Sequence, residues 1–261
     1  MSRDDSIYQQ LRAHLGYLNL AAAAEALPGQ LESARAAKTS HTEFLEALLR
    51  IEVEATEQRR WEGRMRFANL PAPWRIDDFD FSAQPGIDEA LIRELATCGY
   101  VEDAVNVLFI GPPGVGKTML AIALGHAAVD AGHRVYYTTA ADLAARCRKA
   151  ALEGRWEPTM RFFNGPGVLI VDELGYLPMP AEDAAALFQV IARRYLKGSI
   201  ILTTNLGVAS WGDIFTDTTI AAAMLDRLLH KSVVISIDGD SYRLRSHQAK
   251  ARQRRPKGGS D

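Results

Sequence analysis

The stretch Val105-Asn-Val-Leu-Phe-Ile-Gly-Pro-Pro-Gly-Val-Gly-Lys-Thr-Met119 decides the fold of this chain. Its apolar start predicts a buried strand, the pattern Gly-x-x-x-x-Gly-Lys-Thr predicts a phosphate-binding loop, and the helical pattern that follows predicts a helix. Glycines can adopt backbone conformations that are closed to other residues, so consecutive N–H groups of the loop can turn inward around a di- or triphosphate. The stretch therefore predicts a nucleotide site between a strand and a helix.

The residues of this loop have separate expected roles. Lys117 would reach the β and γ phosphates as a point charge, and the Thr118 hydroxyl would hold Mg²⁺. The helix that begins near Lys117 adds the positive end of its dipole. We expect the nucleotide to contact the whole loop, which consists of Gly111, Pro112, Pro113, Gly114, Val115, Gly116, Lys117, Thr118 and Met119.

The composition is that of an ordinary globular protein. The chain has 261 residues, of which 48% are hydrophobic and 24% charged, and its net charge is −2. No apolar run approaches the roughly 20 residues that a membrane span needs, and the N-terminus lacks the core of a signal peptide. We therefore expect a cytoplasmic protein without a membrane partner. Cys98 and Cys147 have no partner motif and predict buried or idle thiols.

Strands and helices alternate after the loop. Strands are predicted over residues 134–139, 168–171, 199–204 and 233–237, and helices over residues 119–131, 140–153, 181–196 and 218–231. Because these strands are apolar on both faces, they predict a parallel sheet that is covered by helices on both sides. The fold class expected for this part of the chain is α/β.

The N-terminal part predicts an all-α domain. A helix is expected to stop at Pro28-Gly29, and the capping box Ser40-His-Thr-Glu43 is expected to open a long helix. Pro71 and Pro73 break the backbone pattern and mark a boundary. The predicted domains are residues 1–68 (helical, with DNA or partner contacts), 69–247 (nucleotide domain) and 248–261 (a basic, disordered tail).

The segment between this boundary and the phosphate loop predicts an extended stretch over residues 77–82 and a helix over residues 86–100. It carries two aromatic residues, Phe79 and Phe81, for which two interpretations remain open. They could line the pocket of the nucleotide base, or they could simply pack against each other.

Basic residues gather in two places. Arg50, Arg59, Arg60, Arg64 and Arg66 surround Trp61 and Met65, and residues 243–257 hold seven basic residues and no acidic one. Arginine contacts phosphate and an aromatic ring can stack on bases, so both places are candidates for nucleic-acid binding. A solvated helix face and a solvated tail are the alternatives.

Polar side chains follow two buried strands. Residues 168–171 end in Asp172 and Glu173, which are costly to bury unless they meet a cation or a positioned water. We expect Asp172 to hold Mg²⁺, directly or through water, and Glu173 to polarise the water that attacks the γ-phosphate. Asn205 follows the next strand and is expected to sense the γ-phosphate. The alternative for these residues is an ordinary turn or cap at the end of a strand.

Residues 111–118, Asp172-Glu173 and Asn205, in this order, resemble the AAA+ ATPases. Four further segments resemble the IstB-like ATP-binding proteins of insertion sequences, which are relatives of the DnaC helicase loader. These segments are Asp78-Phe-Asp-Phe81, Asp172-Glu-Leu-Gly-Tyr176, Ala223-Met-Leu-Asp-Arg-Leu-Leu-His230 and Gly239-Asp-Ser-Tyr-Arg-Leu-Arg245. The resemblance covers most of residues 70–247 and implies an AAA+ P-loop sheet.

The resemblance also bears on residues outside the loop. It implies that Arg227, late in the helix before the last strand, reaches the nucleotide of a neighbouring subunit; Arg193 and Arg194 are competitors, and a surface arginine is the alternative. Too few residues follow Ile237 for the full C-terminal helical lid of most AAA+ proteins. The lid arginine is therefore in doubt, and only Arg243 or Arg245 could replace it.

The function that the resemblance implies is ATP hydrolysis that controls assembly on DNA. The expected cofactors are ATP and Mg²⁺, and the expected partners are duplex DNA, the transposase of the same element, and further copies of the chain in a ring or spiral. The alternatives are a DnaC-like helicase loader and a non-hydrolysing, ATP-gated DNA scaffold. A small-molecule kinase is less favoured, because nothing resembles a lid for an acceptor substrate.

Overall fold

The computed structural model describes residues 3–176, 179–215, 218–239 and 241. The chain divides into two compact units, residues 1–63 and 64–261. This division falls inside a helix, a few residues before the boundary predicted at residues 68 and 69. Among the described residues, no helix has both the length and the apolar character that crossing a membrane requires. The predicted tail, residues 248–261, and the candidate lid residues Arg243 and Arg245 lie outside the described residues.

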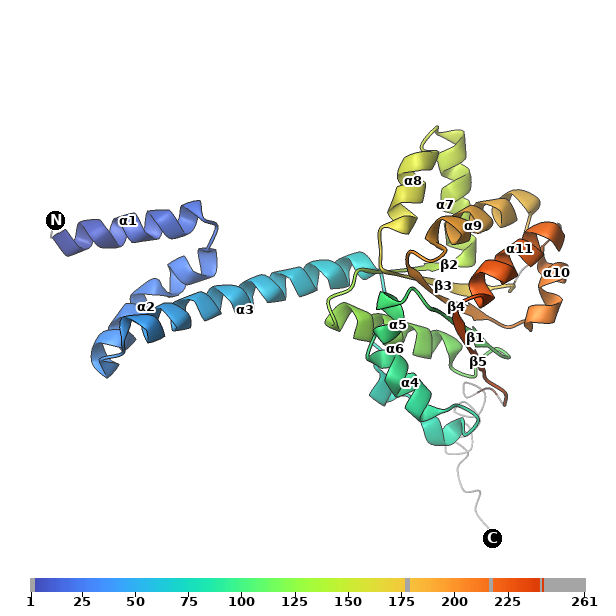
Figure 1. Cartoon of the computed structure of the whole chain (residues 1–261), viewed down its shortest axis with the longest axis horizontal. Coiled ribbons are helices and arrows are strands. Elements are labelled where there is room, and N and C mark those ends of the chain that lie inside the picture. Colours follow the sequence, from blue (N-terminus) through green and yellow to red (C-terminus); the bar gives the residue numbers. More distant parts are fainter. Residues whose placement is uncertain (1–2, 177–178, 216–217, 240, 242–261) are drawn as a thin grey trace, which may run out of the picture. The chain divides into compact units, whose positions relative to one another are not determined.

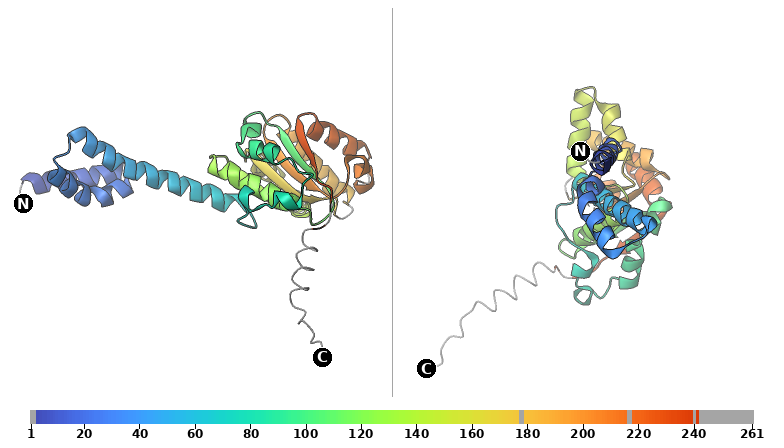
Figure 2. Two further views of the ribbon diagram at one scale, coloured as in Figure 1. Left: turned by 90° about the horizontal axis from the view of Figure 1, so that it is seen from below. Right: turned by 90° about the vertical axis from the view of Figure 1, so that its left-hand side faces the viewer.

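The first unit is helical (Figures 1 and 2). It contains α1 (Arg3–Tyr17), α2 (Ala21–Ala37) and most of α3 (His41–Ala68). The predicted capping box opens α3: the Ser40 N–H donates to the Glu43 carboxylate at 2.7 Å, and the Glu43 N–H donates to Ser40 Oγ at 3.3 Å.

A small core holds these helices together. Its buried side chains, one or two from each helix, are Leu15, Ala23, Leu27 and Leu48. Glu52 of α3 is buried as well, and its carboxylate accepts a hydrogen bond of 3.0 Å from the Ala23 N–H in the first turn of α2. First-turn N–H groups have no partner inside their own helix and form the positive end of its dipole. Glu52 therefore stabilises the start of α2.

Helix α2 continues through Pro28, so the predicted stop at Pro28-Gly29 was wrong. A proline inside a helix removes a hydrogen bond and costs about 3 kcal/mol. Here Leu27, just before the proline, is fully buried, and Leu31, one turn later, packs against the same core. Packing on both sides of Pro28 outweighs the local preference.

The second unit contains a parallel sheet. Its strands are β1 (Asn106–Ile110), β2 (Val135–Thr139), β3 (Val168–Leu174), β4 (Ser199–Thr204) and β5 (Ser232–Ser236). In the described chain these five strands have the order β2-β3-β4-β1-β5, and all their pairings are parallel. Figure 1 shows α4 and α6 on one face of the sheet and α7, α9 and α11 on the other. The predicted α/β fold is confirmed.

The helices of this unit connect the strands. They are α4 (Glu89–Ala96), α5 (Gly99–Glu102), α6 (Lys117–Asp130), α7 (Ala140–Leu152), α8 (Trp156–Asn164), α9 (Ala181–Arg194), α10 (Trp211–Ile214) and α11 (Thr218–Leu229), with short 3-10 helices η1 (Ile76–Asp78), η2 (Phe81–Ala83) and η3 (Val208–Ser210). The sequence did not predict α8, whose buried face consists of Met160 and Phe163.

Two predictions for the segment before the phosphate loop were wrong. Residues 77–82 are not extended, because η1 and η2 form there, and Asp80 caps η2 by accepting from the Ala83 N–H at 3.2 Å. Residues 86–100 do not form one helix. Cys98 has a φ of 67°, in the left-handed region, and this separates α4 from α5.

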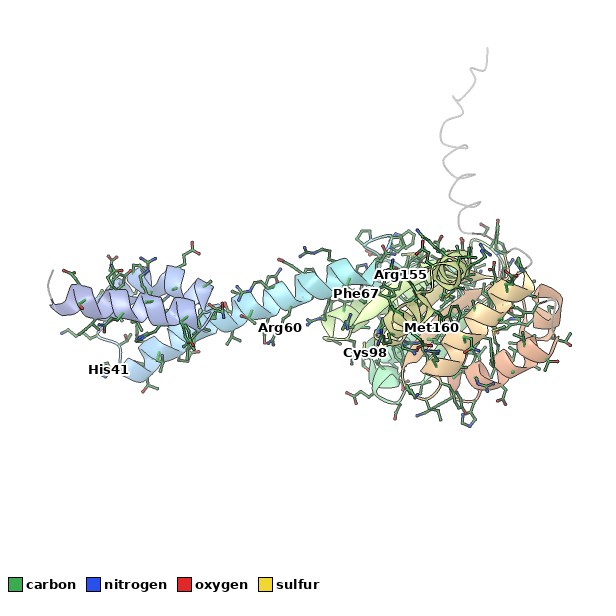
Figure 3. All side chains as sticks on the ribbon, turned by 90° about the horizontal axis from the view of Figure 1, so that it is seen from above. His41, Arg60, Phe67, Cys98, Arg155 and Met160 are labelled. Carbon is green, nitrogen blue, oxygen red and sulfur yellow. The ribbon has the colours of Figure 1, made fainter. Side chains whose placement is uncertain are left out.

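Strand β2 lies at an edge of the sheet and contacts the end of α3. The Asn69 side chain donates a hydrogen bond of 3.1 Å to the carbonyl oxygen of Tyr137. Phe67, labelled in Figure 3, packs against Tyr136 with 5.6 Å between the ring centroids. The last residues of α3 therefore belong to the second unit.

Candidate nucleotide site

The phosphate loop connects β1 to α6 and needs glycine for two reasons. Gly116 has a φ of 104°, which side chains disfavour. A Cβ atom at Gly116 would also lie 2.5 Å from the ring of Phe79, and one at Gly111 would lie 2.1 Å from the carbonyl oxygen of Ile237. Close packing by Phe79 and by the segment after β5 thus fixes the path of the loop.

Lys117 lies along this loop. Its ammonium group donates to the carbonyl oxygens of Gly111 at 2.6 Å and of Pro112 at 2.8 Å. The side chain starts from the first residue of α6, so its charge adds to the positive end of that helix. The loop, the lysine and the helix end together form an environment that favours phosphate.

The carboxylate of Asp172, in β3, accepts hydrogen bonds from hydroxyl groups of three other elements. Its Oδ1 accepts from Thr118 at 3.1 Å and from Thr203, and its Oδ2 accepts from Tyr137 at 2.6 Å. The residue is only 1% exposed, and a carboxylate buried this deeply requires such donors. Burial, together with the bond to Asp172, raises the pKa of Tyr137, so the phenol remains a protonated donor.

The predicted metal ligands lie together. The hydroxyl of Thr118 and the carboxylate of Asp172 are in contact beside the phosphate loop, and hard oxygen atoms of this kind are the ligands that Mg²⁺ prefers. Mg²⁺ is commonly bound through one or two such groups together with phosphate oxygens and waters. The donor set therefore fits Mg²⁺ bound with a nucleotide.

Glu173 and Asn205 follow at the same edge of the sheet. The Glu173 side chain is exposed, next to the buried Asp172. Asn205 follows β4, the strand between β3 and β1, and its Oδ1 atom is buried without a hydrogen-bond partner among the described residues. A buried acceptor without a partner is costly. A water or ligand donor beside the phosphate loop would satisfy it.

A cavity of about 360 Å³ adjoins the loop. It is lined by Trp74, Asp78, Phe79, Asp80, Gln84 and the loop residues Gly114, Val115, Gly116, Lys117, Thr118 and Met119. Phe79 both lines this cavity and packs against Phe81, with 4.9 Å between the ring centroids, whereas Phe81 is not a lining residue. Of the expected contacts, Gly111, Pro112 and Pro113 do not line the cavity. Its size and aromatic walls suit a nucleotide base.

The candidate arginines differ in their surroundings. Arg194 is buried and donates to the carbonyl oxygens of Phe163, Pro166, Gly167 and Ser199, and burial lowers its pKa to about 10. The bonds of Arg194 therefore give it a structural role within the chain.

The other two candidates are less buried. Arg193 makes a bidentate ion pair with Glu157, with N–O distances of 2.7 and 2.9 Å. Arg227 is half-buried, bonds to the Ala223 carbonyl oxygen at 2.9 Å and lies over the Phe188 ring.

Three functional candidates were missed from the sequence: Trp74, Tyr137 and Thr203. A weak signal existed for two of them. Trp74 follows the two prolines that were assigned only to a boundary, and Thr203 lies in a polar end of an otherwise apolar strand. Tyr137 gave no signal, because its role depends on β2 lying beside β3.

Comparison with known proteins agrees with this geometry. Residues 13–251 match the family described as IstB-like ATP binding protein. A protein of Geobacillus stearothermophilus, named as an ATP-binding protein of insertion sequence IS5376, is 44% identical over 237 residues, which cover 91% of this chain and 94% of that protein. One from Pseudomonas aeruginosa, named for insertion sequence IS21, is 48% identical over 215 residues, which cover 82% and 81%.

Solved structures show the same fold at low sequence identity. DnaA from Aquifex aeolicus, bound to AMPPCP, has a TM-score of 0.56 and 20% identity, and the match covers 71% of this chain and 56% of that one. The DnaC helicase loader has a TM-score of 0.53 and 23% identity, with 66% and 98% covered. These likenesses show that the fold is shared with DnaA and DnaC, as predicted for the parallel sheet with its phosphate loop.

Proposed function

The chain belongs to the IstB-like ATP-binding proteins, and on that premise we propose that it hydrolyses ATP with Mg²⁺, assembles on duplex DNA and assists the transposase of its own element. The observation that carries the proposal is the meeting of Thr118, Asp172, Glu173 and Asn205 at one edge of the sheet, beside the phosphate loop. A protein that only bound ATP would not need an exposed carboxylate and an amide next to the phosphates.

Each residue has a role in this proposal. Lys117 binds the β and γ phosphates, and Thr118 and Asp172 hold Mg²⁺, which neutralises phosphate charge when it is bound. Glu173 orients a water and accepts its proton, since its side chain is exposed beside the metal ligands. Asn205 donates to the γ-phosphate and accepts from the water through an oxygen that has no other described partner.

We propose further that Arg227 acts on the ATP of a neighbouring subunit. Among the three candidate arginines, Arg194 is buried and Arg193 is held by Glu157, whereas the bonds described for Arg227 are to its own helix and a ring. An arginine supplied in this way raises the rate by about 10³ to 10⁵ in other systems. Mixing Lys117→Ala with Arg227→Ala subunits should restore part of the ATPase activity; no recovery at any ratio would contradict a shared site.

The exposed arginines of α3 support the proposal that this helix contacts DNA phosphates. Arg60, labelled in Figure 3, and Arg66 are exposed. Arg50 and Arg59, by contrast, pair with glutamates of the same helix. The insertion-sequence names of the relatives support a transposase as the partner.

The test measures binding of the chain to random duplex DNA with ATP, with ADP and without nucleotide, at several salt concentrations. We expect ATP to strengthen binding and salt to weaken it steeply, because phosphate contacts release counterions. An affinity that neither ATP nor salt changes would refute assembly on DNA. Electron microscopy of the same samples shows whether rings or spirals form. Capture of a purified replicative helicase, and not of the transposase, would favour a helicase loader.

A further inference from the structure

A β-bulge separates the two carboxylates of the site. Strands β3 and β4 pair at Val171 with Leu202 and again at Leu174 with Thr204, with a shift of register between. Between these two pairs β3 has two residues, Asp172 and Glu173, whereas β4 has one, Thr203. The two acidic residues therefore lie together opposite Thr203. Glu173 has a φ of 60°, in the left-handed region that non-glycine residues seldom adopt.

This backbone geometry matters because successive side chains of a regular strand point to opposite faces of the sheet. A bulge adds a residue and re-aims the side chain that follows. Here it allows Asp172 to face Thr118 while the next side chain, Glu173, lies exposed beside it. A residue held in an unfavourable φ region persists only when its surroundings fix it.

The surroundings that fix it include one hydroxyl group. Thr203 Oγ1 accepts a hydrogen bond of 3.0 Å from the Glu173 N–H and donates to Asp172 Oδ1. A hydroxyl can donate and accept at once, so this single group ties the backbone of one acidic residue to the side chain of the other. Thr203 is only 1% exposed, so its hydroxyl is shielded from solvent.

We infer that Thr203 is a positioning residue of the nucleotide site, whose hydroxyl holds the bulge and thereby aims Glu173 at the attacking water and Asp172 at the metal. The inference rests on the proposed function, because it concerns the same ATP and Mg²⁺ site. Thr203 lies two residues before Asn205 and so links both carboxylates to the strand that carries the γ-phosphate contact.

The positioning role of Thr203 makes a prediction that a purely structural role does not share. Without its hydroxyl, Asp172 keeps the donors Thr118 and Tyr137, whereas the Glu173 N–H loses its described acceptor. The damage should therefore appear in catalysis and in the response to Mg²⁺, and not in nucleotide binding as such.

The experiment compares Thr203→Val, which removes the hydroxyl and keeps the shape, with Thr203→Ser, which keeps the hydroxyl. The matched control is Thr138→Val, in β2, because the buried Thr138 hydroxyl donates to the carbonyl oxygen of Thr139 and not to a carboxylate. For each variant one measures kcat and KM for ATP, the melting temperature, and the affinity for AMPPCP with Mg²⁺ and with EDTA.

We expect Thr203→Val to lower kcat by about tenfold or more, the equivalent of losing one hydrogen bond to a charged group, with KM changed by less than about threefold. The gain in AMPPCP affinity that Mg²⁺ provides should shrink, while the affinity in EDTA stays at the wild-type value. Thr203→Ser should restore most of kcat and of the Mg²⁺ gain. Thr138→Val should resemble the wild type in all of these measurements.

The inference would be overturned if Thr203→Val kept the wild-type kcat and the wild-type increase in AMPPCP affinity on addition of Mg²⁺. Equal losses in Thr203→Ser and Thr203→Val would also overturn it, because they would indicate packing alone. If Thr203→Val does not melt cooperatively, Thr203→Ala takes its place under the same criteria. A wild-type protein that binds AMPPCP but never hydrolyses ATP would refute the proposed hydrolysis, and the Mg²⁺ gain of the variants would then decide the role of Thr203 by itself.

Discussion

The two units of this chain are stabilised by different means. In the described part of the first unit the core is a small cluster around Leu27, with one buried carboxylate, Glu52, at its margin. In the second unit a parallel sheet is covered on both faces, and its core includes large side chains such as Trp211 and Phe163. Small cores depend on few side chains. We therefore expect that the stability of the first unit and the chemistry of the second can be changed separately.

The largest expected effect lies in the chemistry of the second unit. Glu173→Gln keeps the shape of the side chain but removes the base, so kcat for ATP should fall by about 10² to 10⁴. ATP affinity and the unfolding of both units should stay at wild-type values. Glu94→Gln, at an exposed position of α4, is the control and should retain activity. A Glu173→Gln protein with wild-type kcat would show that Glu173 is not the base.

The next effect lies in the core of the first unit. Leu27→Ala should lower its free energy of unfolding by about 2 to 5 kcal/mol, since it removes a fully buried side chain. Leu45→Ala makes the same change at a residue that is 52% exposed, and should cost less than about 0.5 kcal/mol. Urea unfolding, monitored through the NMR signals of α2 residues, measures the free energy of unfolding of both variants. Loss of AMPPCP affinity in Leu27→Ala would break the proposed independence.

Acid should weaken the first unit through Glu52. The Ala23 N–H and then the Arg59 guanidinium hold the pKa of Glu52 below its ordinary value of 4.5. A carboxyl group with a lowered pKa in the folded state stabilises the fold above its unfolded value, and this contribution disappears as the pH falls through the lowered value. Urea midpoints of the first unit should therefore drop below pH 4.5 in the wild type, and less in Glu52→Gln. Glu54→Gln, exposed on the same helix, should follow the wild type.

The smallest effect concerns DNA. Arg60→Ala should reduce the slope of log affinity against log salt by about 1, which corresponds to one phosphate contact. Arg50 lies between Glu46 at 3.4 Å and Glu54 at 3.9 Å, so Arg50→Ala should change the slope less. Equal slopes in Arg60→Ala and the wild type would place the DNA contacts outside this part of α3.

The sequence predicted features whose geometry is local or carried by a motif. The phosphate loop, the parallel sheet and the adjacency of Thr118 and Asp172 follow from fixed spacing and from apolar strands that end at one edge. Features that depend on distant partners were missed. Tyr137 and Thr203 lie 35 and 31 residues from Asp172 in the chain, and only the order of the strands brings them to it. The role of Arg227 stays a prediction.

Local rules failed where tertiary packing opposed them. At Pro28 the burial of Leu27 carries the helix through a residue that usually ends one. Helix α8 was hidden because it is short and lies between glycine-rich turns, and its identity comes from burial of Met160 and Phe163 beneath neighbouring helices. Periodicity over nine residues is too short a signal to separate such a helix from a loop.

The contact between Asn69 and the Tyr137 carbonyl has a consequence for trimming this protein. An edge strand with open carbonyl and amide groups can pair with another chain and begin aggregation. A shortened protein that starts at Arg64 keeps Phe67 and Asn69 against β2, whereas one that starts at Leu70 removes both. The few residues between these two starting points should therefore decide whether the isolated second unit stays dispersed at high concentration.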